Sequence, residues 1–336
     1  MATSTDSAPQ YKPPKHTYTP EQIAIKDKLK DELDLPEWAE KDEKLLYRFC
    51  RARDFDFEKT ADMLSNYINH VEETDIWDDE RVEATDEYKS MALYILPKPD
   101  KYGRPVMYCR PRFVNPALRK GKENEVEQTF LYWLRKAEKI CKQTEQETSV
   151  LIFEMSGWGM RNRDNATLKM QIDHLQQSYP ESLGICFLYN YPWFVWPVWK
   201  VAQLWLDPNT AAKVVFLDGK DSSPFTELID LDDLPTGLGG KLKETDPLIE
   251  PWPKSGGGLM SWLGWSKSSN DSDTAGAPPD DSVDPLAGLT PAERDQKLKE
   301  LEEEQMAEAE AITKADNAKP KRKPRRRKKK KGGKKR

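Results

Sequence analysis

Cysteine and histidine are scarce in this sequence, and their spacing fits neither a disulfide framework nor a metal site. The four cysteines and three histidines are scattered, and no two cysteines form a CxxC pair. A reducing compartment keeps such thiols free, whereas zinc sites place their ligands in close pairs. The pattern therefore favours free thiols over disulfides or bound zinc. The cysteines are Cys50, Cys109, Cys141 and Cys186.

The chain also lacks segments that would carry it into or across a membrane. No apolar run follows a basic start near residue 1, so we expect no signal peptide. Residues 183–206 approach the length of a membrane span, but two prolines and a lysine interrupt the apolar run. Tryptophan, which is frequent there, prefers the bilayer interface to its centre. We therefore predict that no segment spans a membrane.

Sequence motifs of catalysis are missing as well. The chain contains no Gly-rich dinucleotide-binding motif, no P-loop and no cluster of metal ligands. Residues 156–159 (SGWG) superficially suggest the turn that carries a catalytic serine, but Glu154 stands where that turn requires a glycine. We therefore predict that the protein is not an enzyme and has no catalytic residues, no metal and no cofactor.

The charge of the chain is divided between an acidic body and a basic tail. Residues 319–336 hold 14 Lys or Arg and no acid, which leaves 39 basic against 58 acidic side chains elsewhere. That division is more typical of a membrane tether than of a uniformly basic nucleic-acid binder. Near an anionic leaflet each Lys or Arg contributes about 1 kcal/mol of reversible, salt-sensitive binding. A nuclear localisation signal, a nucleic-acid arm and plain solvation remain alternatives for the tail.

The first 80 residues divide into two parts. Residues 1–18 are polar and proline-rich, which predicts disorder. The following sequence, TPEQ, predicts a helix start, with Thr19 as the N-cap, a proline in the first turn and Gln22 reaching back to the cap. Helical periodicity continues to about residue 71. We predict a small helical bundle over residues 19–80, which has a limited core and must pack on a neighbour.

From residue 91 onward the pattern alternates between strands and helices. Short apolar runs predict the strands, and apolar positions three and four apart predict the helices between them. The order ββαβαβαβ, with short connections, predicts an α/β domain over residues 91–247. Its sheet is expected to be mostly parallel, with right-handed crossovers and covering helices. The predicted strands are residues 91–96, 106–112, 150–153, 183–190 and 213–217.

Beyond that domain the composition indicates a disordered extension with one charged helix. Residues 248–289 are rich in Gly, Ser, Pro and Asp, the composition of a flexible linker. They include an apolar island, Leu259–Trp265, which is either membrane-inserting or incidental. Residues 290–315 predict a highly charged helix with a thin apolar stripe, so it is either solvated or docked on a partner. Residues 316–336 form the basic tail.

Residues 179–217 are the most informative stretch. Two apolar strands flank a segment, residues 193–206, that contains four tryptophans and very few charges. This segment is too apolar for an ordinary amphipathic helix, so it is either fully buried or in contact with something other than water. Just outside it stand Glu181, Thr210 and Lys213, polar groups suited to a charged head group. The pattern predicts a lipid site, with a structural ion pair between the glutamate and the lysine as the alternative.

Several short motifs in this sequence resemble those of the CRAL-TRIO family of lipid carriers, and most closely those of its fungal phosphatidylinositol-transfer branch. Each motif alone is weak evidence, but together the motifs follow the family's order and cover roughly residues 20–247. The resemblance implies the same α/β fold with a helical N-terminal part. The motifs are residues 45–56 (LLYRFCRARDFD), 103–106 (GRPV), 179–181 (YPE), 190–192 (NYP), 206–213 (LDPNTAAK) and 234–240 (LPTGLGG).

The resemblance also implies which residues bind ligand. Family members hold the phosphoinositol head group with a glutamate, a threonine and a lysine that correspond to Glu181, Thr210 and Lys213. One arginine of the first motif also contributes to head-group binding. Arg51 and Arg53 are both candidates, and because they lie two apart on a helix they point in different directions.

The family's mobile gate, which closes the acyl-chain cavity, corresponds to residues 193–206. Aromatic side chains suit a gate that meets the bilayer interface. One departure concerns phosphatidylcholine: members that carry it place serine or threonine where residues 157–161 read GWGMR, which puts a choline-lipid site in doubt. A sterol, squalene-like or haem ligand stays open. The expected gate residues are Trp193, Phe194, Trp196, Trp199 and Trp205.

The expected function is that of a lipid-transfer protein, which takes up phosphatidylinositol in a gated hydrophobic cavity and exchanges it between membranes. The alternative is a lipid-sensing adaptor that presents its charged C-terminal helix and basic tail to a protein or nucleic-acid partner. We expect a monomeric, cytoplasmic protein that binds membranes peripherally and holds a phospholipid in place of a cofactor. The basic tail leaves a nuclear location open.

Overall fold

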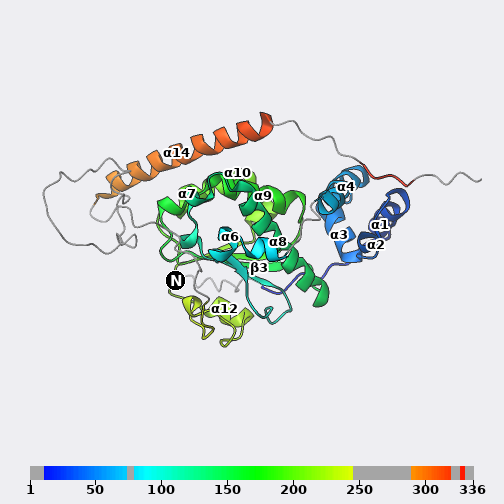
Figure 1. The fold of residues 1–336 in the computed structure, drawn as a ribbon, viewed down its shortest axis with the longest axis horizontal. Helices are drawn as coiled ribbons and strands as arrows, with labels where there is room; N and C mark the ends of the chain where they lie inside the picture. Colours follow the sequence, from blue (N-terminus) through cyan, green and yellow to red (C-terminus); the bar gives the residue numbers. More distant parts are fainter. Residues whose placement is uncertain (1–10, 74–78, 245–288, 319–325, 330–336) are drawn as a thin grey trace, which may run out of the picture.

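Figure 1 shows the fold in a computed structural model, which describes residues 11–73, 79–244, 289–318 and 326–329. Residues 1–10, almost all of the predicted linker and most of the basic tail lie outside the described residues. The apolar island at Leu259–Trp265 lies outside them as well.

A five-stranded sheet forms the centre of the molecule. Its strand order follows the chain, β1-β2-β3-β4-β5, with β1 antiparallel to β2 and the other pairs parallel. This confirms the mostly parallel sheet that the alternation of strands and helices predicts. The strands are β1 (Leu93–Ile95), β2 (Val106–Cys109), β3 (Ser149–Glu154), β4 (Leu183–Tyr189) and β5 (Val214–Leu217).

Three helices link the parallel strands: α8 (Glu123–Gln143), α9 (Asn165–Gln177) and α10 (Val195–Trp205). Because the strands are neighbours in chain order, right-handed crossovers place these helices on one side of the sheet. In Figure 1 they lie above it, and α12 (Ser223–Leu228) lies below. No helix of the described residues is both long and apolar enough to cross a bilayer. The shorter segments are α5 (Asp79–Glu83), α6 (Asp86–Lys89), α7 (Pro116–Arg119), α11 (Pro208–Ala211) and 3-10 turns at Pro111–Phe113, Met160–Asn162 and Thr236–Leu238.

The main core is centred on the inner strands. Ile152 of β3 and its partner Phe187 of β4 are fully buried. On the face away from α10, the ring of Phe187 lies 5.2 Å from that of Phe225 in α12 and 5.6 Å from that of Tyr11, measured between centroids. Burying a large apolar side chain contributes about 1.5–3 kcal/mol. Tyr11 therefore anchors residues 11–18 on the sheet, although the polar composition there predicts disorder.

The N-terminal helices have a small core of their own. Leu29, Leu46 and Leu64 come from three different helices and are fully buried in one cluster. Thr19 caps the first helix as predicted: its hydroxyl accepts from the Gln22 backbone at 3.3 Å, and the Gln22 side chain accepts from the Thr19 backbone at 3.0 Å. The helices are α1 (Pro20–Glu32), α2 (Glu37–Glu40), α3 (Glu43–Arg51) and α4 (Phe57–Glu73).

The N-terminal bundle packs on the α/β part of the chain, as its limited core requires. The Tyr67 hydroxyl of α4 donates to Glu138 of α8 at 3.2 Å. Arg48 of α3, which is almost completely buried, forms an ion pair with the same carboxylate at 3.5 Å. A buried charge needs a partner, so these contacts fix the bundle on α8.

The charged C-terminal helix, α14 (Pro291–Ala318), lies on the body of the molecule. Figure 1 shows it crossing above α10 and α9. Leu301 and Ala309 are buried in clusters that include residues of α10. The sequence did not decide whether this helix is solvated or docked. In the structure its thin apolar stripe packs on α10, because α10 offers an apolar surface beside it.

Candidate functional site

Glu181 and Lys213 lie at the amino ends of two neighbouring parallel strands. Glu181 comes shortly before β4, and Lys213 comes directly before β5. Because the two strands are paired, the Lys213 Nζ lies 3.8 Å from the Glu181 Oε2. The Glu181 side chain is 31% exposed and the Lys213 side chain is 28% exposed, so water screens much of their attraction. The result is an accessible ion pair that a ligand could enter.

Glu181 has an unusual backbone conformation. Its φ of +55° lies in the left-handed region, which a residue with a Cβ enters at a cost of about 1 kcal/mol or more. Glycine would adopt this conformation without steric strain. A glutamate at this position is therefore held at the expense of stability, as is common where a side chain is needed for binding.

Arg51 reaches the same region from the end of α3. Its guanidinium contacts the carboxylate of Glu147 and the hydroxyl of Tyr18. The Arg51 Nε is buried and has no hydrogen-bond partner among the described residues. Glu147 stands just before β3, so the residues preceding β3, β4 and β5 contribute Glu147, Glu181 and Lys213 in turn. Arg51, with its buried and unpartnered Nε, lies beside this row of three charged residues.

The segment before α1 supplies two further side chains. The ring of Tyr18 stacks on Tyr47 at 3.8 Å between centroids, and the ring of His16 lies 6.3 Å from that of Tyr18. Burial lowers the pKa of His16, and the positive charges of Arg51 and Lys213 lower it further, against the opposing effect of nearby carboxylates. A neutral His16 near pH 7 is thus part of the cluster.

The side chains of Thr210 and Arg53 form different contacts from those of Glu181, Lys213 and Arg51. The Thr210 hydroxyl donates to the Asp207 carboxylate at 2.6 Å, and the Thr210 backbone donates to it at 2.9 Å, which caps α11. Burial raises the pKa of Asp207, but these bonds and the nearby charge of Lys213 lower it overall. The guanidinium of Arg53 donates to the carbonyl of Ala52 at 2.7 Å. Of the two candidate arginines, Arg51 is therefore the one beside Glu147.

The aromatic residues predicted for the gate divide into an inner and an outer set. Phe194 and Trp205 are buried, whereas Trp196 is 46% exposed. Trp196 stacks on Phe216 of β5 at 4.7 Å, and Trp199 meets the same ring edge-on at 5.5 Å. Phe216 therefore holds the outer face of α10 against the last strand. Trp193, the fifth of these residues, is partly buried beside Phe194.

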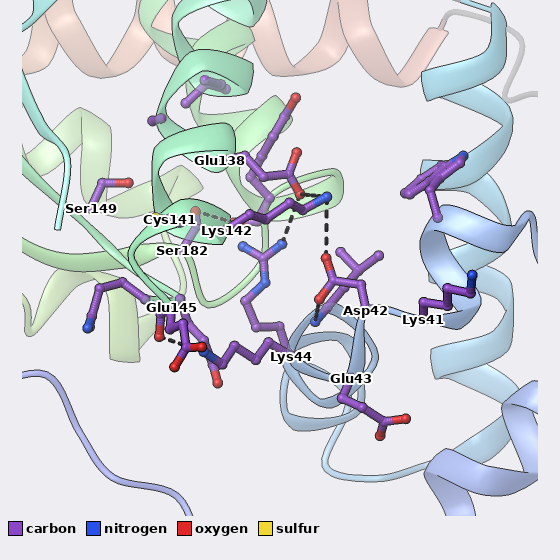
Figure 2. Close-up of a pocket in the computed structure, with 18 residues that line it drawn as sticks. Lys41, Asp42, Glu43, Lys44, Glu138, Cys141, Lys142, Glu145, Ser149 and Ser182 are labelled. Carbon is purple, nitrogen blue, oxygen red and sulfur yellow. Dashed lines mark hydrogen bonds and ion pairs between the residues drawn. The ribbon is translucent and has the colours of Figure 1, made fainter. Parts of the chain in front are cut away.

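A pocket of about 560 Å³ lies between the N-terminal bundle and α8. Figure 2 shows Lys142 of α8 extending toward Asp42 at the start of α3, and their charged atoms are 3.3 Å apart. Half of the residues that line the pocket are charged, with acids and bases in similar number, and the others include apolar side chains of α8 such as Leu134 and Ala137. Glu147 and Ser182 belong to its lining, so it adjoins the cluster around Lys213.

Three of these residues have no signal in the sequence that marks them for a site. His16 and Tyr18 lie in a segment whose composition predicts disorder, and Glu147 lies in a polar loop after α8. Their positions depend on the docking of the N-terminal segment and on the sheet register. Chemically, the cluster combines an ammonium and a guanidinium, suited to a phosphodiester, with carboxylates that can accept from sugar hydroxyls.

Two family models match the chain. The model described as "CRAL/TRIO, N-terminal domain" matches residues 19–66, and the model described as "CRAL/TRIO domain" matches residues 89–240. Together they span more than half of the chain.

Several named proteins are similar to this chain. Phosphatidylinositol transfer protein CSR1 of Eremothecium gossypii is 33% identical over 208 residues, which are 59% of this chain and 47% of that protein. Phosphatidylinositol/phosphatidylcholine transfer protein SFH12 of Arabidopsis thaliana is 29% identical over 235 residues, 62% of this chain and 41% of that protein. A solved structure named "Crystal structure of Sfh5" is 19% identical, with a TM-score of 0.48 over 69% of this chain and 91% of that one. The chain spans less than half the length of either of the two curated relatives.

Replacing Glu181 by glycine is expected to stabilise the lipid-free protein by about 1 kcal/mol, because the left-handed strain disappears and the lost ion pair is half-exposed. Urea denaturation of both proteins measures the difference. Glu145→Gly is the matched control, because Glu145 has a φ of +57° and should show a similar gain. A loss of stability in Glu181→Gly beside a gain in Glu145→Gly would mean that the Glu181 backbone is not strained.

Proposed function

The chain belongs to the CRAL/TRIO family, and from that premise we propose that it binds phosphatidylinositol and exchanges it between membranes. The names of the two relatives described above, one of them a fungal phosphatidylinositol transfer protein, describe lipid carriers, not enzymes. The single observation that carries the proposal is the Lys213–Glu181 pair at 3.8 Å, with the unused Arg51 donor beside it.

The head group is proposed to bind between these charges. The Lys213 ammonium and the Arg51 guanidinium would hold the phosphodiester, and Glu181 would accept hydrogen bonds from the inositol hydroxyls. Binding would separate the half-exposed ion pair, at a cost of about 1 kcal/mol or less. Thr210 would contribute through its hydroxyl oxygen, whose proton is already donated to Asp207.

The acyl chains are proposed to enter beneath α10, which acts as the gate. Bringing a two-chain phospholipid into water exposes about 30 methylenes at about 0.8 kcal/mol each, on the order of 25 kcal/mol. No carrier can pass through that state, so the chains must slide directly from the bilayer into an apolar interior. Helix α10 fits this task because it packs on Phe216 at the sheet edge and presents Trp196 and Leu204 to the outside.

The remaining expectations are retained as proposals. The protein would act as a cytoplasmic monomer at an anionic membrane surface, aided by its basic tail. A choline lipid is not proposed, because Trp158 fills the place after the central strand's glycine and packs against Phe194 with 5.0 Å between ring centroids. The adaptor alternative is not pursued, because α14 lies on α9 and α10 and no observation favours its presentation to another partner.

The double variant Lys213→Ala/Glu181→Ala is expected to lose phosphatidylinositol transfer almost completely, because both charges that contact the head group are gone. Transfer of radiolabelled phosphatidylinositol between vesicles measures the effect. The matched control is Lys220→Ala/Asp218→Ala, which removes an exposed ion pair of 3.7 Å at the opposite end of β5. Unchanged transfer by the first variant, with its melting temperature preserved, would reject the head-group assignment.

Leu204→Glu is expected to weaken association with vesicles about tenfold without loss of stability, because Leu204 is 53% exposed on α10 and a charge there resists burial in the bilayer interface. Co-sedimentation with liposomes measures the association. Leu231→Glu is the matched control, since Leu231 is 46% exposed and follows α12, a helix that lies on the other side of the sheet from α10 in Figure 1. An equal effect of the two substitutions would exclude α10 as the membrane-contacting element.

A further inference from the structure

Helix α14 is attached to α10 by both apolar and polar contacts. Ala309 is fully buried in a cluster with residues of α10. The Trp205 indole donates to the Thr313 hydroxyl at 3.0 Å, and Lys200 lies 2.6 Å from Glu302. Trp205 would otherwise leave a buried indole N–H without a partner at the end of α10. The helix proposed as the gate is therefore held from outside by α14.

Helix α14 is also attached to the start of α9, the helix beside α10 on the same side of the sheet. Arg163, just before α9, lies 2.8 Å from Glu308, and the Asn165 amide donates to the same carboxylate at 3.0 Å. Gln305 is fully buried and accepts from Asn165 at 3.3 Å. Because α14 is bonded to both α9 and α10, α10 cannot move away from α9 without breaking one of these sets of contacts.

The described part of the basic tail is docked on the acidic N-terminal bundle. Arg326 contacts Glu58, and Arg327 lies 2.6 Å from Glu72, both on α4. Figure 1 shows this red segment beside α4 and α1, on the far side from α10. Only seven residues separate Ala318 from Arg326, at most about 28 Å of extended chain. Docking of the tail therefore keeps the end of α14 close to the body.

The charges of these two segments have opposite signs. Helix α14 carries nine acidic and four basic residues, whereas residues 319–336 carry 14 basic residues and no acid. An anionic bilayer facing α10 would repel α14 and attract the tail. Each tail charge near such a surface contributes about 1 kcal/mol, whereas an exposed ion pair contributes about 0–1 kcal/mol. The bilayer can therefore outcompete the acidic bundle for the tail.

We propose that α14 and the basic tail form a latch that holds α10 closed in solution, and that an anionic bilayer surface releases it by capturing the tail. Release would free the apolar face of α10 where the membrane is able to cover it. The proposal rests on the proposed function, because that function makes α10 the gate. The release itself, however, is measured without any transfer of lipid.

Hydrogen–deuterium exchange of the full chain tests the release. With vesicles made of equal parts phosphatidylcholine and phosphatidylserine, amides of residues 291–318 should exchange about tenfold faster or more, because docked helices exchange only after undocking. Pure phosphatidylcholine vesicles should have no such effect, and added salt should reduce it. Equal exchange with both kinds of vesicle would overturn the proposal, and release by RNA but not by anionic vesicles would assign the tail to nucleic acid instead.

A matched pair of variants tests the link between α14 and the gate. Ala309→Arg places a charge in the buried contact and should give fast α14 exchange without vesicles, whereas Ala311→Arg lies on the exposed face and should not. Ala309→Arg should also transfer phosphatidylinositol from neutral vesicles about tenfold faster than the parent chain. If Ala309→Arg exchanges fast but transfers lipid at the rate of the parent chain, undocking α14 does not open the gate, and the latch proposal is rejected. No transfer by any variant or by the parent would instead reject the proposed function, while the exchange result would still decide the tail capture.

Discussion

Helix α10 is so apolar that it cannot stand in water uncovered, and most of the molecule is arranged around that constraint. Its inner side packs on the sheet through a cluster that includes Val198 and residues of β3, β4 and β5. Its outer aromatic ring, Trp196, lies flat on Phe216. The remaining side is covered by α14, a helix that is itself highly charged. This charged helix is the part of the covering that we propose an anionic bilayer removes.

The candidate head-group site has its own structural cause. Parallel strands that are neighbours in the sheet bring the residues before them to one edge, so Glu147, Glu181 and Lys213 converge although they lie far apart in the sequence. Ligand sites in open α/β sheets more commonly lie at the carboxyl ends of the strands. The proposed site lies instead at the amino ends, where α3 and the segment before α1 supply Arg51 and the stacked rings of Tyr18 and Tyr47.

Much of the fold follows from local patterns, and the site follows only in part. The apolar runs and the helix periodicity between them predict the parallel order of the sheet, and that order alone brings Lys213 near Glu181. The choice between Arg51 and Arg53 depends on how α3 is oriented against the sheet, which helix periodicity cannot give. The sequence did not mark His16 as a site residue, because its segment has the composition of a disordered one and is ordered only by the burial of Tyr11. The position of α14 was left open for a similar reason, since a thin apolar stripe does not identify the surface that it covers.

The central claim is that the charged pair before β4 and β5 holds the inositol phosphate end of one phospholipid. Native mass spectrometry of the protein, after incubation with mixed phospholipid vesicles that include phosphatidylinositol, tests it most directly when the bound lipid is extracted and identified. The account predicts one phosphatidylinositol molecule per chain, selected over the other lipids present. A chain that remains without lipid, or that selects a lipid lacking inositol, would contradict it.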